Sequence, residues 1–172
     1  MAFLKKIKKK ATKRLFTNTK KLHSELIDKT ANYIKRSQNG GYSVVLKDFV
    51  ACHSTGEVAD VLGVSQGGRT CLCEIKTSRS DFKADSRKFF RQYPHMGMGD
   101  YRYYVCPEGL IKEDELPESW GLIYFYGGKL TTIVKAEKQK SNSKSEVAVL
   151  FSALRRFFSE PNKCKKDFKW FN

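Results

Sequence analysis

Three short runs of β-branched and aromatic residues follow one another between residues 42 and 77, and they constrain the fold more than any other feature. The runs are 42–50 (YSVVLKDFV), 57–64 (EVADVLGV) and 70–77 (TCLCEIKT). Each has the length and composition of a strand, and glycines at 67 and 68 make a turn between the second run and the third. The sequence therefore predicts an antiparallel meander of three strands.

Helical and extended segments alternate around this meander. Apolar residues recur at helical spacing over 22–36, and a serine ahead of an acid marks a helix start near residue 78, with the helix running to about 92. A strand over 101–106, a loop over 107–119, a hairpin of 120–126 with 130–135 and a helix over 146–158 complete the pattern. This order predicts one α/β domain over 22–158, with a mixed sheet flanked by helices, between a basic arm (1–21) and a basic aromatic tail (159–172).

The chain is strongly basic. It has 33 Lys and Arg against 18 Asp and Glu, a net charge of +15, which favours association with polyanions such as nucleic acid or an acidic membrane surface. Residues 1–21 contain nine Lys and Arg and no acid, and their apolar residues allow a basic amphipathic helix. The arm fits a nucleic-acid contact and a solvated extension equally well, whereas its apolar face is thin for a membrane-surface helix.

Cysteine usage points to a reducing compartment. The five cysteines are odd in number, and the sequence shows neither a secretory signal nor a stretch long enough to span a membrane. We therefore expect a cytoplasmic protein without a membrane partner. Cys71 and Cys73 share a strand face and could bind zinc, but no second pair completes a standard zinc site.

Three charged residues stand in otherwise apolar strand runs. Residues two apart share a strand face, so Glu74 and Lys76 point the same way. A hairpin closed at the glycine turn brings Asp60 close to Glu74, and a divalent cation would relieve the repulsion between the two carboxylates. Lys76 could then orient a water or stabilise negative charge on a phosphate. A plain cross-strand pair on the surface is the alternative, because Glu-x-Lys is common on strands.

These residues resemble a known nuclease core. Asp60 followed by Glu74-Ile75-Lys76 is similar to the PD-(D/E)XK superfamily, with Ala59 at the place of the proline. The string CLCEIKTSRSDFKADSRK and its flanks, over about residues 50–125, resemble the small MmcB-like group of bacterial and phage proteins linked to DNA repair.

The resemblance implies a restriction-endonuclease-like core and Mg²⁺-dependent hydrolysis of DNA, with Mn²⁺ as a substitute. It implies that Asp60, Glu74 and the Ile75 carbonyl bind the metal and that Lys76 positions the attacking water. Members of the superfamily often add an acid from the first helix, and Glu25 is the best match. A phage-encoded member would act in the host cytoplasm.

Basic residues follow the core motif on the expected helix. Lys83, Arg87 and Arg91 are spaced as one stripe, and with Arg79 and Lys88 they could clamp phosphates. A solvated helix face explains the same stripe equally well.

Two acids lie on the same helix. Asp81 fits a role at the helix start, and Asp85 is expected to pair with Arg79, Lys88 or Arg102.

Three functions of different kinds agree with these patterns. The first is a metal-dependent nuclease acting on DNA, with RNA not excluded. The second is a nucleic-acid-binding module of the same fold that does not cut, and the third is a phage protein that docks on a host complex. A single site per chain allows either a nicking monomer or a cutting homodimer.

Overall fold

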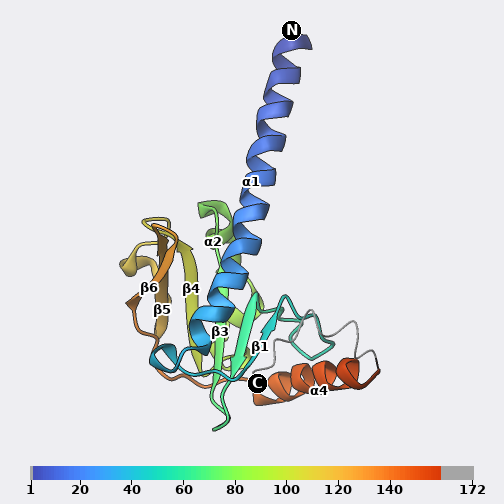
Figure 1. Cartoon of the computed structure of the whole chain (residues 1–172), viewed down its shortest axis with the longest axis vertical. Coiled ribbons are helices and arrows are strands. Elements are labelled where there is room, and N and C mark those ends of the chain that lie inside the picture. Colours follow the sequence, from blue (N-terminus) through green and yellow to red (C-terminus); the bar gives the residue numbers. More distant parts are fainter. Residues whose placement is uncertain (1, 160–172) are drawn as a thin grey trace.

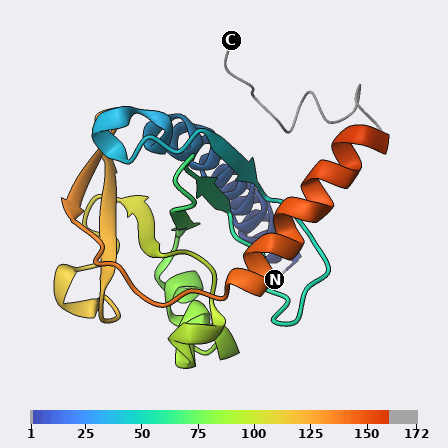
Figure 2. The ribbon, with the colours of Figure 1, turned by 90° about the horizontal axis from the view of Figure 1, so that it is seen from below.

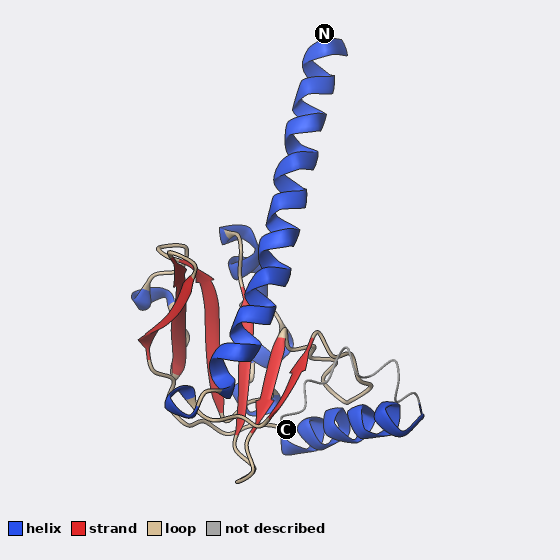
Figure 3. Cartoon of the chain, in the orientation of Figure 1, coloured by secondary structure: helices blue, strands red, loops and turns tan. Residues whose placement is uncertain are grey.

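A six-stranded mixed sheet forms the centre of the protein. The computed structural model describes residues 2–159, without the side chains of residues 2–18 and 37. The sheet order follows the chain from β1 to β6, and Figure 3 shows the strands side by side. The strands are β1 (Val44–Lys47), β2 (Val61–Val64), β3 (Thr70–Ile75), β4 (Tyr101–Pro107), β5 (Trp120–Tyr126) and β6 (Lys129–Val134).

Strand directions divide the sheet into three parts. β1, β2 and β3 pair antiparallel, which confirms the predicted meander. β4 and β5 both run parallel to their predecessors, and β6 returns antiparallel to β5. The predicted hairpin around residues 127 and 128 is therefore also confirmed. The first two strands are shorter than predicted, and residues 57–60 lie before β2 instead of within it.

Helices cover both faces of the sheet, as Figure 2 shows. One face packs on α1 (Ala2–Lys35) through the residues Leu26, Ile27, Ala31 and Ile34, which recur at helical spacing. The other face packs on Phe82 of α2 (Arg79–Asp85) and on Val149 and Ala153 of α4 (Ser143–Ser159). The expectation of an α/β domain with a mixed sheet between helices is thus confirmed.

The predicted arm and the predicted first helix are a single helix. α1 has 34 residues, a length of about 50 Å at 1.5 Å per residue. Its second half lies on the sheet, whereas its first half projects away from the domain (Figure 1). The predicted boundary at residue 21 therefore does not end a helix. It lies within one continuous helix, between the part that projects from the domain and the part that packs on the sheet.

The helix expected after β3 is broken into two. Ser78 caps α2, and its hydroxyl accepts a hydrogen bond from the Asp81 backbone N–H, as the sequence indicates. α2 ends at Asp85, and a separate turn, α3 (Phe89–Gln92), follows. Short 3₁₀ turns complete the connections at Ser37–Asn39, Pro94–Met96 and Glu113–Glu115.

The structure bears on two further expectations, the absence of a membrane-spanning segment and the basic aromatic tail. Among the helices of residues 2–159, none combines the length and the apolar character that crossing a bilayer requires. The aromatic tail, apart from the end of α4, lies outside the described residues.

Candidate active site

Strand register brings the two predicted carboxylates together. Val61 pairs with Cys73, so one further step along the antiparallel ladder places Asp60 opposite Glu74 on the same face. The Ile75 backbone N–H donates to Asp60 Oδ2 at 2.7 Å, which fixes the aspartate at the carboxyl end of β3. The predicted approach of Asp60 to Glu74 is therefore confirmed.

Glu74 and Lys76 form a buried ion pair. Their side chains are only 3% and 4% exposed, and Lys76 Nζ lies 3.1 Å from Glu74 Oε2. Alternation along the strand places both on the face where the structure has them. The reading of Glu-x-Lys as a surface cross-strand pair is therefore wrong, because this pair lies in the interior.

Asp85 is the second acid that holds Lys76. Lys76 Nζ lies 3.3 Å from Asp85 Oδ1, and Lys88 Nζ lies 2.7 Å from the same oxygen. The Tyr104 hydroxyl donates to Asp85 Oδ2 at 2.8 Å. Of the three partners expected for Asp85, Lys88 is confirmed.

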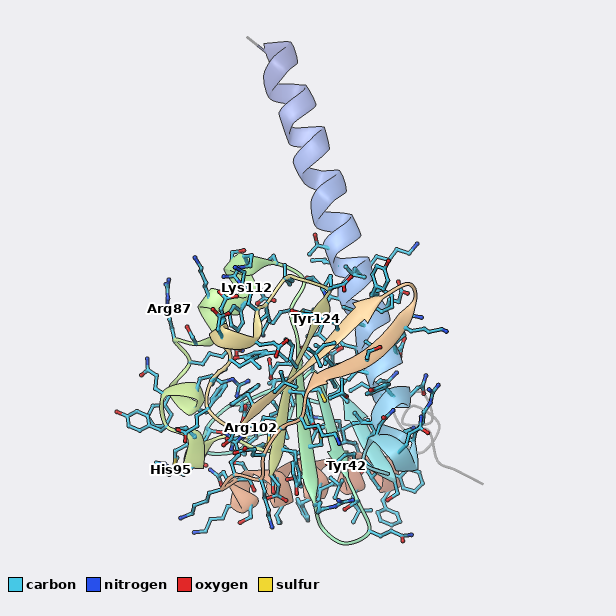
Figure 4. The ribbon with its side chains drawn as sticks, turned by 90° about the vertical axis from the view of Figure 1, so that its left-hand side faces the viewer. Tyr42, Arg87, His95, Arg102, Lys112 and Tyr124 are labelled. Atoms are coloured by element: carbon cyan, nitrogen blue, oxygen red, sulfur yellow. The ribbon has the colours of Figure 1, made fainter. Side chains whose placement is uncertain are left out.

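The other two expected partners of Asp85 bind elsewhere. Arg79 pairs with Glu115, and the Arg102 guanidinium donates to backbone carbonyls, including that of Gly99 at 3.0 Å. Figure 4 shows Arg102 within the body of the domain.

Arg91 joins three acids at the centre of the cluster. Its guanidinium binds Glu57 and lies 3.0 Å from Glu74 Oε1 and 2.8 Å from Asp85 Oδ2. Its side chain is 3% exposed and lies over the ring of Trp120. The placement of Arg91 on an exposed phosphate-binding stripe is therefore wrong. The break after α2 accounts for the difference, because Arg91 lies on α3 and no longer shares one continuous helix with Lys83, so the helical spacing does not apply.

Glu57 is a member of this cluster that the sequence patterns did not reveal. It is 1% exposed, and besides binding Arg91 it accepts a hydrogen bond from the Met98 backbone N–H at 2.6 Å. Its position at the start of an apolar run was the available signal, because an acid next to buried positions is rarely left without a partner. We call the set Glu57, Glu74, Lys76, Asp85 and Arg91 the buried charge cluster.

The acids of this cluster have different affinities for protons. Burial raises the pKa of Glu74 to about 7, and the negative charges of Asp60 and Asp85 add to the effect of burial, against Arg91 and Lys76. Burial would also raise the pKa of Asp85, but Arg91 and Lys76 with two direct hydrogen bonds hold it well below its usual value. Lys76 has a raised pKa, since its two acids outweigh its burial. Glu74 is therefore the acid that is least stable in its charged form.

The residue that α1 contributes is His23, not Glu25. His23 Nε2 lies 3.6 Å from Asp60 Oδ2, and this contact raises the pKa of the histidine. Glu25 is 48% exposed and pairs with Lys29, 3.7 Å away. Two residues differ by about 200° around a helix, so the choice depends on helix phase. The burial of Leu26 against the sheet sets the phase that turns His23 toward Asp60 and leaves Glu25 half exposed.

The predicted phosphate-binding residues differ in what they contact. Lys83 and Arg87 are exposed on and just after α2, and Figure 4 shows Arg87 at the outer end of the domain. Arg79 and Lys88 are exposed as well, but each is paired with an acid. The exposed cationic surface is therefore smaller than the stripe suggested.

The oxygen ligands implied for Mg²⁺ fit a cation held by few protein groups. Glu74 Oε1 is buried and accepts no hydrogen bond, although Arg91 Nη2 is within ion-pair distance. Among the residues that the structure describes, no three His, Cys, Asp or Glu side chains form a metal-binding group. Mg²⁺ commonly uses only one or two carboxylates and completes its octahedron with water and phosphate. Asp60 and Glu74, with the Ile75 carbonyl, are the residues that would hold it.

Comparison with known proteins supports the fold and gives no information about function. No family model and no curated protein matches the chain. A protein of unknown function from Silicibacter pomeroyi has a similar solved structure, with a TM-score of 0.56 and 21% identity over 79% of this chain and 90% of that one. At this identity the likeness concerns the fold alone.

Proposed function

We propose that this protein is a metal-dependent nuclease that hydrolyses phosphodiester bonds of DNA. The observation that carries the proposal is the convergence of Asp60 and Glu74 at the carboxyl end of β3, beside a lysine bound to Glu74. Opposed carboxylates with an adjacent lysine suit the binding of a hard cation and the stabilisation of charge on a phosphate. The cation, when bound, would lower the pKa of a water molecule and polarise the phosphate.

The exposure of each site residue suggests its role in the proposed reaction. Asp60 is 19% exposed and lies beside His23, so it is the carboxylate that solvent reaches first. Glu74 lies behind it in the interior with a raised pKa, and it would have to be deprotonated to hold a cation. Lys76 remains protonated between two acids, and a fixed positive charge there would favour the charge that develops on the phosphate.

The remaining features of the proposal concern the substrate and the compartment. Lys83 and Arg87 are exposed on and just after α2, the helix that carries Asp85, and would contact the backbone of the substrate. Cys52, Cys71, Cys73 and Cys106 are free thiols, which fits the cytoplasmic location that we propose. A role in bacterial or phage DNA processing and the assembly of a cutting homodimer belong to the same hypothesis.

The experiment is a cleavage assay with matched variants. The parent chain, Asp60→Asn, Glu74→Gln and the control Glu118→Gln, an exposed acid, are incubated with plasmid, single-stranded DNA and RNA in Mg²⁺, Mn²⁺ or EDTA. We expect cleavage by the parent and the control only with metal, and none by the other two. Cleavage in EDTA, or parental rates for Asp60→Asn and Glu74→Gln, would refute the assignment.

A nucleic-acid-binding module that does not cut is the second candidate, and one observation favours it. Lys76 and Arg91 already neutralise Glu74, and all three side chains are nearly inaccessible. A buried charge cluster can have a purely structural role, in which it holds β3, α2 and α3 together and takes no part in catalysis. Binding of DNA without cleavage under every metal condition would favour this candidate over the nuclease.

A further inference from the structure

A groove lies between the last turns of α1 and strand β6, apart from the buried charge cluster. It consists of two adjoining cavities of about 380 and 490 Å³ that share Tyr33. The Tyr33 hydroxyl forms a hydrogen bond of 2.9 Å with the Thr132 hydroxyl and accepts one from the Thr132 backbone N–H, which joins the helix to the strand. We call these two cavities the α1–β6 groove.

Tyrosine rings line the larger cavity. Tyr33, Tyr42, Tyr101 and Tyr103 contribute to it from α1, from the loop before β1 and from β4. Figure 4 shows Tyr42 at the end of the domain away from Arg87. Neither Lys83 nor Arg87 lines either cavity.

Two of these rings rest directly on the backbone of glycines. A Cβ atom added at Gly63 would lie 2.9 Å from the Tyr42 side chain, and one added at Gly121 would lie 2.3 Å from the Tyr103 ring. Any other residue at these positions would displace the rings. Their positions are thus fixed before a ligand arrives, which reduces the entropy lost on binding.

Positive charge accompanies the rings, and none of the described residues that line the two cavities is acidic. The cations are Lys29, Arg36, Arg69, Lys129 and Lys135. Within the described part of the chain, no ion pair engages the side chains of Arg36, Lys129 or Lys135. Aromatic faces beside unpaired cations are the combination that holds a nucleobase together with its phosphate.

We propose that the α1–β6 groove binds single-stranded nucleic acid, with bases stacked on the half-buried rings of Tyr33, Tyr101 and Tyr103 and phosphates held by its cations. Tyr42 is only 4% exposed and lies under Arg69, so it forms part of the cavity wall. A duplex does not fit this chemistry, because its bases already stack on one another and offer no free face. The two cavities have the volume of ligand sites and adjoin each other, so a strand of more than one nucleotide fits better than a mononucleotide.

The groove is a second site and not an extension of the first. None of the residues that line the two cavities belongs to the buried charge cluster, and Asp60 is not among them. Tyr42 of the groove packs against Gly63 near the end of β2, whereas Asp60 lies before the start of that strand. The inference draws on the proposed function only for the class of polymer. It extends that function by naming an unpaired strand as the form that is held.

Binding without cleavage tests this inference separately from the nuclease. Fluorescence anisotropy of the full chain in EDTA is measured with a labelled single-stranded oligothymidylate, a duplex, thymidine monophosphate and a poly-glutamate peptide. We expect the single strand to bind most tightly. Equal affinity for the duplex or for the acidic peptide would overturn the inference, and loss of metal-dependent cleavage would not affect it.

Variants locate the binding in the groove. Lys129→Ser with Lys135→Ser should lower the slope of log affinity against log salt by about 1.4, at about 0.7 for each lost phosphate contact on a single strand. The matched control is Lys138→Ser with Lys144→Ser, which removes the same charge from exposed positions outside the groove. An equal fall in both slopes would overturn the inference.

Stacking is tested at Tyr101, for which no side-chain hydrogen bond is found among the described residues. Tyr101→Leu should weaken binding of the single strand by about fivefold or more, since stacking on one aromatic ring contributes about 1–3 kcal/mol. Tyr101→Phe keeps the ring and should bind as the parent does. Parental affinity in Tyr101→Leu would overturn the inference, and if thermal melting shows that this variant does not fold, the lysine pairs decide it.

Discussion

The raised pKa of Glu74 predicts that Glu74→Gln gains stability relative to the parent as the pH rises from about 4.5 to about 7. The carboxyl group has a pKa of about 7 in the folded protein against an ordinary value of 4.5. A difference of that size corresponds to about 3 kcal/mol, at about 1.4 kcal/mol for each tenfold change in proton affinity. Glu74→Gln keeps the shape of the side chain and has no proton to lose.

The direction in which the free energy of unfolding changes with pH depends on whether the folded or the unfolded state binds the proton of Glu74 more tightly. Below pH 4.5 Glu74 is neutral in both states, so the parent loses no stability through it. Between 4.5 and 7 the unfolded chain ionises first, and the free energy of unfolding falls as the pH rises. Above about pH 7 the whole effect is present. Glu74→Gln lacks this dependence, so its stability relative to the parent should rise by about 3 kcal/mol from pH 4 to pH 8.

Urea unfolding of the parent, Glu74→Gln and Glu118→Gln at pH 4, 5, 6, 7 and 8 measures this difference. The exposed Glu118 is the control, and its variant should follow the parent at every pH. A difference between Glu74→Gln and the parent that does not change with pH would refute the reasoning. It would mean that Arg91 and Lys76 compensate the burial of Glu74 fully.

Three further predictions concern single interactions. Lys76→Ala should lower the rate of cleavage by orders of magnitude and leave Mn²⁺ binding measurable by isothermal titration, because the group acts on the transition state; loss of Mn²⁺ binding would instead indicate that Lys76 organises the site. Arg91→Leu should reduce the free energy of unfolding by about 3–5 kcal/mol, since it leaves buried acids without their partner. The control Arg87→Leu at the surface should change it by less than about 0.5 kcal/mol. Similar urea midpoints for the two variants would contradict the burial of Arg91. Deletion of residues 2–21 should weaken DNA binding and flatten its dependence on salt, as their nine positive charges are lost, and an unchanged slope in anisotropy titrations would exclude contact between the arm and DNA.

Local patterns predicted the elements and the meeting of the carboxylates. The glycines at 67 and 68 located the connection between β2 and β3, so Asp60 could be expected close to Glu74. The hairpin of β5 and β6 was predictable for the same reason. The pairing of Val64 with Thr70 sets the register that places the two acids opposite each other, and the glycines alone did not give it. Short-range turn chemistry determines register, and register determines which side chains share a face.

The rest of the site depends on geometry that local patterns do not determine. His23 and Glu25 differ only in helix phase, which the packing of Leu26 on the sheet decides. Arg91 looks like the third cation of a stripe until the break after Asp85 is known. Glu57 and Arg91 form an ion pair although they are 34 residues apart in the sequence. Local spacing patterns do not predict a contact over that separation.

The single helix α1 consists of two parts that should open independently. Residues such as Leu26 and Ile34 are locked against the sheet, so their backbone amides can exchange hydrogen only when the domain opens. The projecting half (Figure 1) has only its own helical propensity, which is marginal for a short isolated helix in water. Hydrogen exchange should therefore increase steeply toward the N-terminus within one unbroken helix, and a protease should remove the first turns without unfolding the domain. A nucleic acid bound along the projecting half would slow that exchange, and the slowing would mark how far along the helix the contact extends.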